Sequence, residues 1–310
     1  MEVRKAQLSS GTLFVSLPKA WVVRHGLGKG SPIFMEERED GALVLYPFGK
    51  VKYIPKSAVV LVSPDMEKMI TSKYWLGYDS IVIRSPTGKI GLAERERIKN
   101  LVRRFIGLEV VEENASSIEL HCFIEASSVP PKKILRREHL LTAAMLRDLK
   151  EASLGDEVLL KSIVARDDEV DKLYFLLVRI LRIAIQNPVL SSELKVSPLD
   201  CMDYRLVACF IESIADSIAS MADSLLKHMN SPRVYLERFR SLLTMLSEIY
   251  EKAMEGFLAK DFKRAELARA KRKVFDSRLS SEDLGDIRFL SSELVKVADI
   301  AVDIADLVIP

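Results

Sequence analysis

The sequence predicts a multidomain α+β protein in which a small β-rich head and a middle α/β segment precede an all-α C-terminal half. Residues 2–47 contain short, turn-rich strand patterns, and residues 50–128 alternate strand and helix signals. After the Pro130-Pro131 pair, only three glycines and three prolines occur before the terminal Pro310. We therefore expect domains at residues 1–48, 49–131 and 132–310.

The composition is that of a soluble globular protein. The 310 residues are 48% hydrophobic and 29% charged, and the net charge of +2 is too small to indicate a nucleic-acid or membrane partner by itself. The three cysteines form no CxxC pair, which favours reduced thiols. No apolar signal segment follows Met1, and charged residues interrupt the longest apolar runs, so we expect a cytoplasmic protein without membrane insertion.

In the head, residues 3–9 and 12–17 are predicted strands, and a helix begins at Pro18. A second hairpin turns at Asp40-Gly41. A β-β-α-β-β unit of this length buries too little apolar surface to be stable alone, so it needs a second copy or a partner domain. The head is also basic, and its candidate phosphate-binding side chains are Arg4, Lys5, Lys19, Arg24 and Lys29.

These residues resemble the SpoVT-AbrB (swapped-hairpin) DNA-binding domain. The similarity rests on Arg4-Lys5, on the stretch from Gly11 to Lys19, on Gly26–Ser31 and on Asp40-Gly41. It implies an obligate homodimer that interlaces its strands and docks a basic face on DNA, with an affinity that falls as salt rises. Thr12 stands where these domains often carry a basic residue, so the residues that read bases are not assigned. A dimerisation module with ordinary surface lysines is the alternative.

The middle segment has a β-α-β-α-β-β order, which predicts one small sheet with helices on one face. It contains no glycine-rich phosphate loop, no G-x-S-x-G sequence and no metal-binding spacing of histidine or cysteine. His121 alternates with apolar neighbours, as a core or edge histidine does. The stretch from Val129 to Lys133, which includes two prolines, predicts a linker.

The C-terminal half predicts six helices, at about residues 138–153, 157–187, 201–229, 232–259, 261–277 and 283–309. The third and sixth predicted helices contain a repeated sequence motif. Ile214-Ala215-Asp216 recurs as Val297-Ala298-Asp299 with an offset of 83 residues. Repetition of this kind predicts two three-helix units, at about 138–229 and 232–309, each with its own core.

The helix predicted at Ile163–Gln186 carries acidic residues on its packing face. At about 100° per residue, Asp167 falls in the middle of an apolar arc that extends to Ile185, and Asp171 lies on its edge one turn later. The opposite face is predicted to carry Asp168, Lys172 and Arg179. A carboxylate on a packing face is costly unless it is paired or coordinates a cation, so Asp167 is not expected to be simply solvated.

Residues 138–309 resemble PhoU, the regulator of phosphate uptake, a family with two three-helix bundles that carry E/D-x-x-x-D motifs. The segment Asp167–Asp171 supplies one motif, and Glu212–Asp216 supplies the second. The resemblance implies that the carboxylates of Asp167, Asp171, Glu212 and Asp216 gather around one or more metal ions. Such a site favours Mg, Mn or Ca, with Fe also acceptable. For Glu212 and Asp216, solvation or pairing with Arg182 or Arg205 is the alternative.

The acidic pattern is incomplete in the second three-helix unit. Arg272 stands where the first acid of a pair with Asp276 is expected, and Val295 replaces the counterpart of Glu212. The acids that remain as weaker candidate ligands are Asp299 and Asp303. A second metal cluster is therefore expected to be a remnant. The fifth helix is strongly basic, and a solvated face is the commonest explanation for such a run.

Together the resemblances imply a DNA-binding regulator of phosphate uptake and homeostasis, in which a metal-binding helical sensor is coupled to the head. The middle segment resembles the spacer of archaeal proteins of this type. The alternative is a signalling adaptor that acts on a phosphate transporter or kinase partner, with the head used only for dimerisation. We expect no enzyme and no catalytic residues, because the Glu-x-x-His pairs of di-iron oxidases and a nucleophile–base pair are both missing from the sequence.

Overall fold

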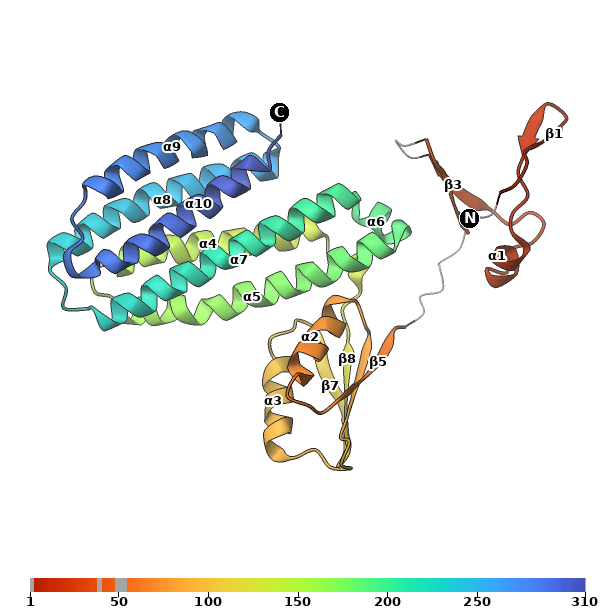
Figure 1. Ribbon diagram of the computed structural model, residues 1–310, viewed down its shortest axis with the longest axis horizontal. Helices are drawn as coiled ribbons and strands as arrows, with labels where there is room; N and C mark the ends of the chain where they lie inside the picture. The colour runs from red at the N-terminus through yellow and green to blue at the C-terminus, as the bar shows by residue number, and fades with distance from the viewer. Residues whose placement is uncertain (1–2, 38–40, 48–54, 310) are drawn as a thin grey trace. The chain divides into compact units, whose positions relative to one another are not determined.

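A computed structural model describes residues 3–37, 41–47 and 55–309 of the chain (Figure 1). The chain divides into two compact units, Met1–Pro55 and Lys56–Pro310. The predicted domain boundary between residues 48 and 49 and the turn residue Asp40 lie outside the described residues.

The first unit contains two antiparallel hairpins and one short helix. Its elements are β1 (Gln7–Ser9), β2 (Thr12–Phe14), α1 (Lys19–Arg24), β3 (Ile33–Glu37) and β4 (Leu43–Pro47). The strands pair as β1 with β2 and β3 with β4, and the two hairpins form separate sheets. Gly11 has φ +82°, a left-handed conformation that glycine adopts without strain, and it forms the tight turn between β1 and β2. No described residue of this unit is buried, so one copy has no apolar core of its own.

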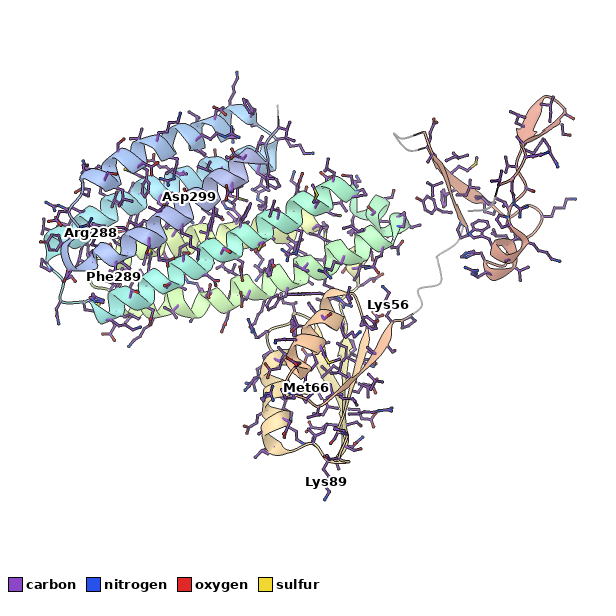
Figure 2. The ribbon with its side chains drawn as sticks, in the orientation of Figure 1. Lys56, Met66, Lys89, Arg288, Phe289 and Asp299 are labelled. Atoms are coloured by element: carbon purple, nitrogen blue, oxygen red, sulfur yellow. The ribbon has the colours of Figure 1, made fainter. Side chains whose placement is uncertain are left out.

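The second unit begins with a four-stranded sheet in the order β5-β6-β8-β7. Its elements are β5 (Ser57–Leu61), α2 (Met66–Trp75), β6 (Ser80–Arg84), α3 (Leu92–Val102), β7 (Leu108–Glu113) and β8 (Ser117–Cys122). β5 and β6 are parallel, and β8 is antiparallel to both of its neighbours. Helices α2 and α3 cover one face (Figure 1), over a core that includes Ile70, Ile81 and Ile98. Met66, at the start of α2 (Figure 2), is fully buried there. The element order is the one predicted.

The rest of the second unit is helical. Its helices are α4 (Pro131–Ala152), α5 (Glu157–Gln186), α6 (Pro188–Leu194), α7 (Pro198–Lys227), α8 (Arg233–Ala259), α9 (Phe262–Ser281) and α10 (Ser291–Asp306). Helices α4, α5 and α7 pack on one another, as do α8, α9 and α10. Contacts of α4 with α8 and of α7 with α10 join the two bundles. The expectation of two separate cores is wrong, because one continuous cluster of buried side chains spans both bundles.

Two local features differ from the sequence prediction. The stretch Val129–Lys133 is not a free linker, because Pro131 is the buried first residue of α4, a position that tolerates proline since its backbone N–H needs no partner. The chain also forms the extra helix α6 after Asn187, whose side chain caps it by accepting a 3.2 Å hydrogen bond from the backbone N–H of Leu190.

Capping residues fix the starts of the two long helices that matter for the site. The carboxylate of Asp156 accepts a 3.0 Å hydrogen bond from the N–H of Leu159 and begins α5. A reciprocal capping box between Ser197 and Asp200 begins α7. The apolar arc of α5 is buried as predicted except at Ile185, which is 53% exposed near the end of the helix. In the described part of the chain, no helix combines the length and apolar character needed to cross a bilayer.

Candidate metal centre

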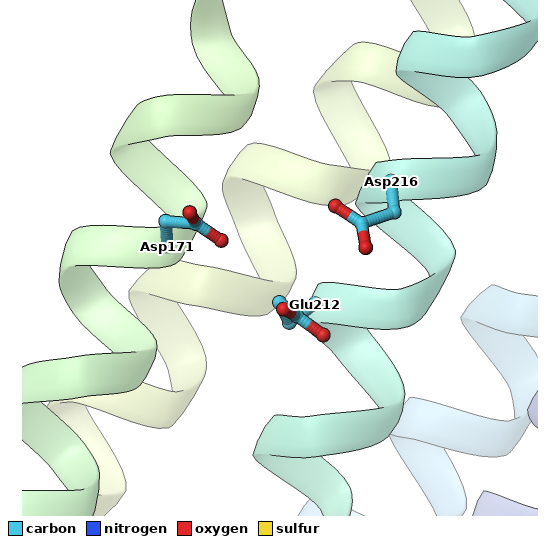
Figure 3. A group of neighbouring side chains, drawn as sticks. All are labelled: Asp171, Glu212 and Asp216. Atoms are coloured by element: carbon cyan, nitrogen blue, oxygen red, sulfur yellow. The ribbon is translucent and has the colours of Figure 1, made fainter. Parts of the chain in front are cut away.

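Acidic side chains meet where α5 packs against α7. Each helix supplies two of them, four residues apart and so one turn apart on one face: Asp167 and Asp171 from α5, Glu212 and Asp216 from α7. One carboxylate oxygen from each of Asp171, Glu212 and Asp216 lies within 4.8 Å of the other two (Figure 3). Among the residues that the structure describes, this is the one group of three or more such side chains close enough to share an ion.

Asp167 lies beside this group of three. It is half-buried next to Asp216, and its Oδ1 atom is buried without a hydrogen-bond partner in the described structure. Burial, followed by repulsion from Asp216 and Asp171, raises the pKa of Asp167 to about 7. This carboxyl is therefore poorly stabilised as an anion while no cation is nearby.

The pKa values of the two acids on α7 are raised as well. Burial and the neighbouring Asp216 and Asp171 raise the pKa of Glu212. Burial and Asp171 raise the pKa of Asp216, and the nearby Lys296 opposes that shift. Several carboxylates held close together in a partly dry place repel one another, and a cation relieves both the repulsion and the cost of burial.

A further acid, Glu138 on α4, was missed in the sequence-based prediction of the site. It is fully buried, and neither of its carboxylate oxygens has a hydrogen-bond partner in the described structure. The hydroxyl of Thr142, one turn later, is also buried and unpartnered there. Burial, then repulsion from Glu212, raises the pKa of Glu138 well above its usual range, so this carboxyl faces the same acidic region. The signal was present in the sequence, because Glu138 shares a helix face with Leu135 and Thr142 just as Asp167 shares one with Ile163.

The residues present fit a hard cation. Carboxylate oxygens are the ligands that Mg²⁺, Ca²⁺ and Mn²⁺ prefer, and the three grouped acids come from two rigid, tightly packed helices. Buried carboxylate oxygens without partners, as in Asp167 and Glu138, are also what a cation site supplies. The groups that would hold the ion are Asp171, Glu212 and Asp216, with Asp167 at its side.

An arginine of the α/β domain, which is formed by β5–β8 with α2 and α3, contacts this site. The Nη2 atom of Arg104 donates a 2.7 Å hydrogen bond to Oδ2 of Asp171. Arg205 lies over the ring of Tyr174, with its guanidinium carbon 4.8 Å from the ring centre. The alternative for Glu212 and Asp216 was solvation or pairing with Arg182 or Arg205. Among the described residues neither arginine forms an ion pair with these acids, whereas Asp216 is exposed to solvent. No sequence pattern indicated Arg104, which is 67 residues from its partner.

In the second bundle, an arginine side chain lies among the acidic residues and pairs with them. The Nη2 atom of Arg272 donates a 2.7 Å hydrogen bond to Asp299, and the same guanidinium also pairs with Asp276. Asp303 is exposed on α10 and makes the third acid of this region. The basic run of α9 is therefore not a simply solvated face. Ion pairs tie it to acids of the neighbouring helices, among them Arg264–Glu255, Lys271–Glu248 and Arg269–Asp306.

The five candidate phosphate-binding residues of the head are all exposed. Lys19 and Arg24 lie on α1, and Lys29 follows in the turn that leads to β3. Arg4 and Lys5 precede β1, and Nη1 of Arg4 donates a 3.0 Å hydrogen bond to the hydroxyl of Ser16. Exposed cations of this kind can reach phosphate oxygens without breaking a buried contact.

Comparison with protein families assigns both ends of the chain. The model of the PhoU domain matches residues 135–225, which is the bundle that contains the acidic cluster. The chain carries a PhoU domain. The model of the antidote-toxin recognition protein MazE, a bacterial antitoxin, matches residues 7–53 and identifies the head as a MazE/AbrB-like domain. No curated protein and no solved structure matches the chain.

The two matches confirm the architecture expected from the resemblances. The PhoU match includes all four candidate ligands of the first bundle and stops before the second bundle, where Arg272 interrupts the acidic pattern. The MazE match includes Lys19, Arg24 and Lys29, whereas Arg4 and Lys5 precede it. PhoU and AbrB-like domains are regulatory families.

Proposed function

We propose that the protein is a cytoplasmic, DNA-binding regulator of phosphate uptake and homeostasis. Its head dimerises and contacts DNA, and its PhoU domain responds to a bound metal ion. The observation that carries this proposal is the presence in one chain of a MazE/AbrB-like domain and a PhoU domain with an acidic cluster. The two matches support a phosphate-related regulator, and the charges on each part suggest the ligand of each.

Dimerisation of the head is supported by what one copy leaves exposed. Nine large apolar residues in the described part of the head are each more than half exposed in one copy: Val3, Leu8, Leu13, Phe14, Val15, Val23, Phe34, Met35 and Leu43. Large apolar side chains left exposed in such number favour an interface with another protein chain. Because the two hairpins form separate sheets, a second copy that interlaces with them would complete a core that one chain lacks.

DNA binding is supported by the five exposed cations of the head, which a dimer would present twice. Arginine and lysine contacts to phosphates release condensed counterions, so the affinity should fall steeply with salt. The test is a gel shift with DNA from upstream of the gene, using the full chain at several salt concentrations. Arg24→Gln and Lys29→Gln should weaken binding and lower the salt slope by about 1 for each phosphate contact removed.

Lys89→Gln is the matched control for that test, because Lys89 is an exposed cation of the second unit. It should leave the affinity unchanged. Absence of DNA binding at low salt would contradict the proposed regulator. The alternative function would then be favoured: a PhoU-type adaptor that acts on phosphate transporter components or a kinase and uses its head only to dimerise.

The proposed ligand of the PhoU domain is a divalent or trivalent metal ion, such as Mg, Mn, Ca or Fe, held by Asp171, Glu212 and Asp216 with Asp167 beside them. The test is metal analysis and calorimetric titration of the purified full chain. Asp171→Ala and Asp216→Ala should lower the metal content and the affinity. The control Asp168→Ala removes an exposed acid from the same helix and should change neither. Unchanged metal content in the first two variants would rule out this site.

A further inference from the structure

The α/β domain packs directly on the helix that carries the candidate metal site. Phe175 of α5, one turn after Asp171, lies between Phe105 and Trp75 of the α/β domain. Its ring centre is 5.4 Å from that of Phe105 and 5.7 Å from that of Trp75. Phe175 and Trp75 border the apolar cores of both domains, so the contact is a continuous packed interface.

A buried arginine anchors this interface. Arg179 of α5, predicted to lie on the face opposite the apolar arc, is only 1% exposed. Its Nη1 atom donates hydrogen bonds of 2.8 and 2.9 Å to the carbonyl oxygens of Tyr74 and Tyr78, and Nη2 lies 3.7 Å from Oδ1 of Asp79. Arg179 is buried because the α/β domain, not water, covers this face of the helix. Arg179 thus holds α5 to the end of α2 independently of the acidic cluster.

A second arginine forms the exposed edge of the same interface, and it reaches the metal site. Arg104 lies in the turn between α3 and β7. Its guanidinium carbon is 5.3 Å from the centre of the Phe175 ring, and its Nη2 atom donates to Oδ2 of Asp171 at 2.7 Å. Arg104 is half-exposed, whereas Asp171 is largely covered. The α/β domain therefore supplies a positive charge to one of the three grouped carboxylates.

A metal ion and Arg104 cannot bind the carboxylate of Asp171 independently of each other. The grouped carboxylates of Asp171, Glu212 and Asp216 attract the guanidinium, and a divalent cation among them would cancel most of that attraction. It would also place two positive centres against one carboxylate, and like charges repel at this range. Each of the two cations should therefore weaken the binding of the other, and this coupling must be equal in both directions.

We propose that Arg104 is a tethered cation that competes with a divalent metal ion for Asp171, so that metal binding at the acidic cluster releases this edge of the α/β domain from α5. The inference rests on the metal site proposed above and concerns its regulation. Arg179 and the aromatic contacts of Phe175 keep the domain attached while the turn at residues 103–107 moves. The middle segment would then be the part of the chain that first responds to occupancy of the site.

The test is titration of the metal-free full chain with Mn²⁺, followed by calorimetry. Arg104→Gln should bind Mn²⁺ about 5-fold more tightly than the wild type, the low end of typical coupling between two sites, because the competing charge is half-exposed. Arg104→Lys retains the charge and should remain close to the wild type. Arg97→Gln is the matched control, since it breaks another exposed ion pair of the same helix region, with Glu67, away from the site. It should not change the affinity.

Hydrogen exchange gives the second measurement. In the wild type, Mn²⁺ should increase exchange in residues 103–107. In Arg104→Gln the exchange there should already be high and should not respond to Mn²⁺. An unchanged or weaker affinity in Arg104→Gln, or the same exchange in all states, would overturn the inference.

The variant Asp216→Asn separates this inference from the proposed site, because Asp216 lies on α7 and does not contact Arg104. If Asp216→Asn weakens Mn²⁺ binding and Arg104→Gln fails to strengthen it, the cluster binds metal and only the competition is wrong. If the wild type binds no Mn²⁺ that depends on Asp216, the metal site and the competition both fail.

Discussion

Arg272 of α9 donates a 2.7 Å hydrogen bond to Asp299 of α10, the residue that the 83-residue repeat pairs with Asp216 of α7. The same guanidinium pairs with Asp276, the counterpart of Asp171. At this place in the second bundle, a side chain thus supplies the positive charge that the first bundle would take from a metal ion. Arg272 therefore has two effects: it leaves the acidic pattern one carboxylate short, and it pairs with two of the acids that remain.

The first prediction follows from this difference between the bundles. Asp216→Asn should lower the affinity for Mn²⁺ by about 10-fold or more, because it removes one of three grouped carboxylates, and each 1.4 kcal/mol lost is tenfold. Asp299→Asn, and likewise Asp303→Asn, should have little effect, since Arg272 already neutralises that region. Titration calorimetry measures both. Equal losses from Asp216→Asn and Asp299→Asn would mean that the second bundle also binds a metal ion.

The second prediction concerns the buried anchor of the α/β domain. Arg179→Leu should lower the free energy of unfolding by about 3 kcal/mol, because it leaves the carbonyl oxygens of Tyr74 and Tyr78 buried without donors. Hydrogen exchange at residues 74–79 should rise at the same time. The control Arg182→Leu alters an exposed arginine three residues later on α5 and should change stability little. Similar losses from both variants would contradict the anchoring role, and chemical denaturation measures them.

Much of this fold could be predicted from local patterns. The alternation of apolar residues placed the strands of the α/β domain, and the helical period placed the long helices, because both patterns are short-range. The same period placed Asp167 on a buried face of α5. Applied to α4, that argument would also have found Glu138.

What the sequence did not reveal depends on long-range contacts. Arg179 and Arg182 look alike in the sequence, and only the packing of the α/β domain on α5 buries the first and leaves the second in water. Arg104 reaches the site because the turn after α3 lies beside α5, which no local pattern encodes. The missing acid of the second bundle is visible in the sequence as Arg272, but the pairing of Arg272 with Asp299 is visible only in the structure.

The third prediction is a pH dependence of stability that comes from Asp167. Its pKa is raised to about 7 in the folded protein, whereas the ordinary value is 3.8. The unfolded chain therefore loses this proton at lower pH than the folded protein does, so the free energy of unfolding should fall as pH rises from about 4 to about 7. In metal-free protein at pH 8, Asp167→Asn should be more stable than the wild type by about 2 kcal/mol, about half of the full value for such a shift because the side chain is half-exposed.

Chemical denaturation at several pH values without divalent ions measures this effect. Asp168→Asn is the matched control, because the adjacent acid is exposed on the same helix, and its curve should follow that of the wild type. Parallel curves for Asp167→Asn and the wild type between pH 4 and pH 8 would show that the carboxyl of Asp167 is not destabilised as an anion.

The fourth prediction concerns the apolar surface of the head. Leu13 and Phe14 lie on β2 and are exposed in one copy, although leucine and phenylalanine side chains contribute about 1.5 to 3 kcal/mol each when they are fully buried. If a second copy covers them, Phe14→Asp should place a charge inside that interface and shift the full chain from dimer to monomer in analytical ultracentrifugation. Leu92→Asp is the control, because Leu92 is at least as exposed as Phe14 but lies at the start of α3 in the second unit. It should leave the association state unchanged. A wild-type chain that sedimented as a monomer at micromolar concentration would show that the exposed apolar residues of the head have another partner, and DNA binding by a dimeric head would then be excluded.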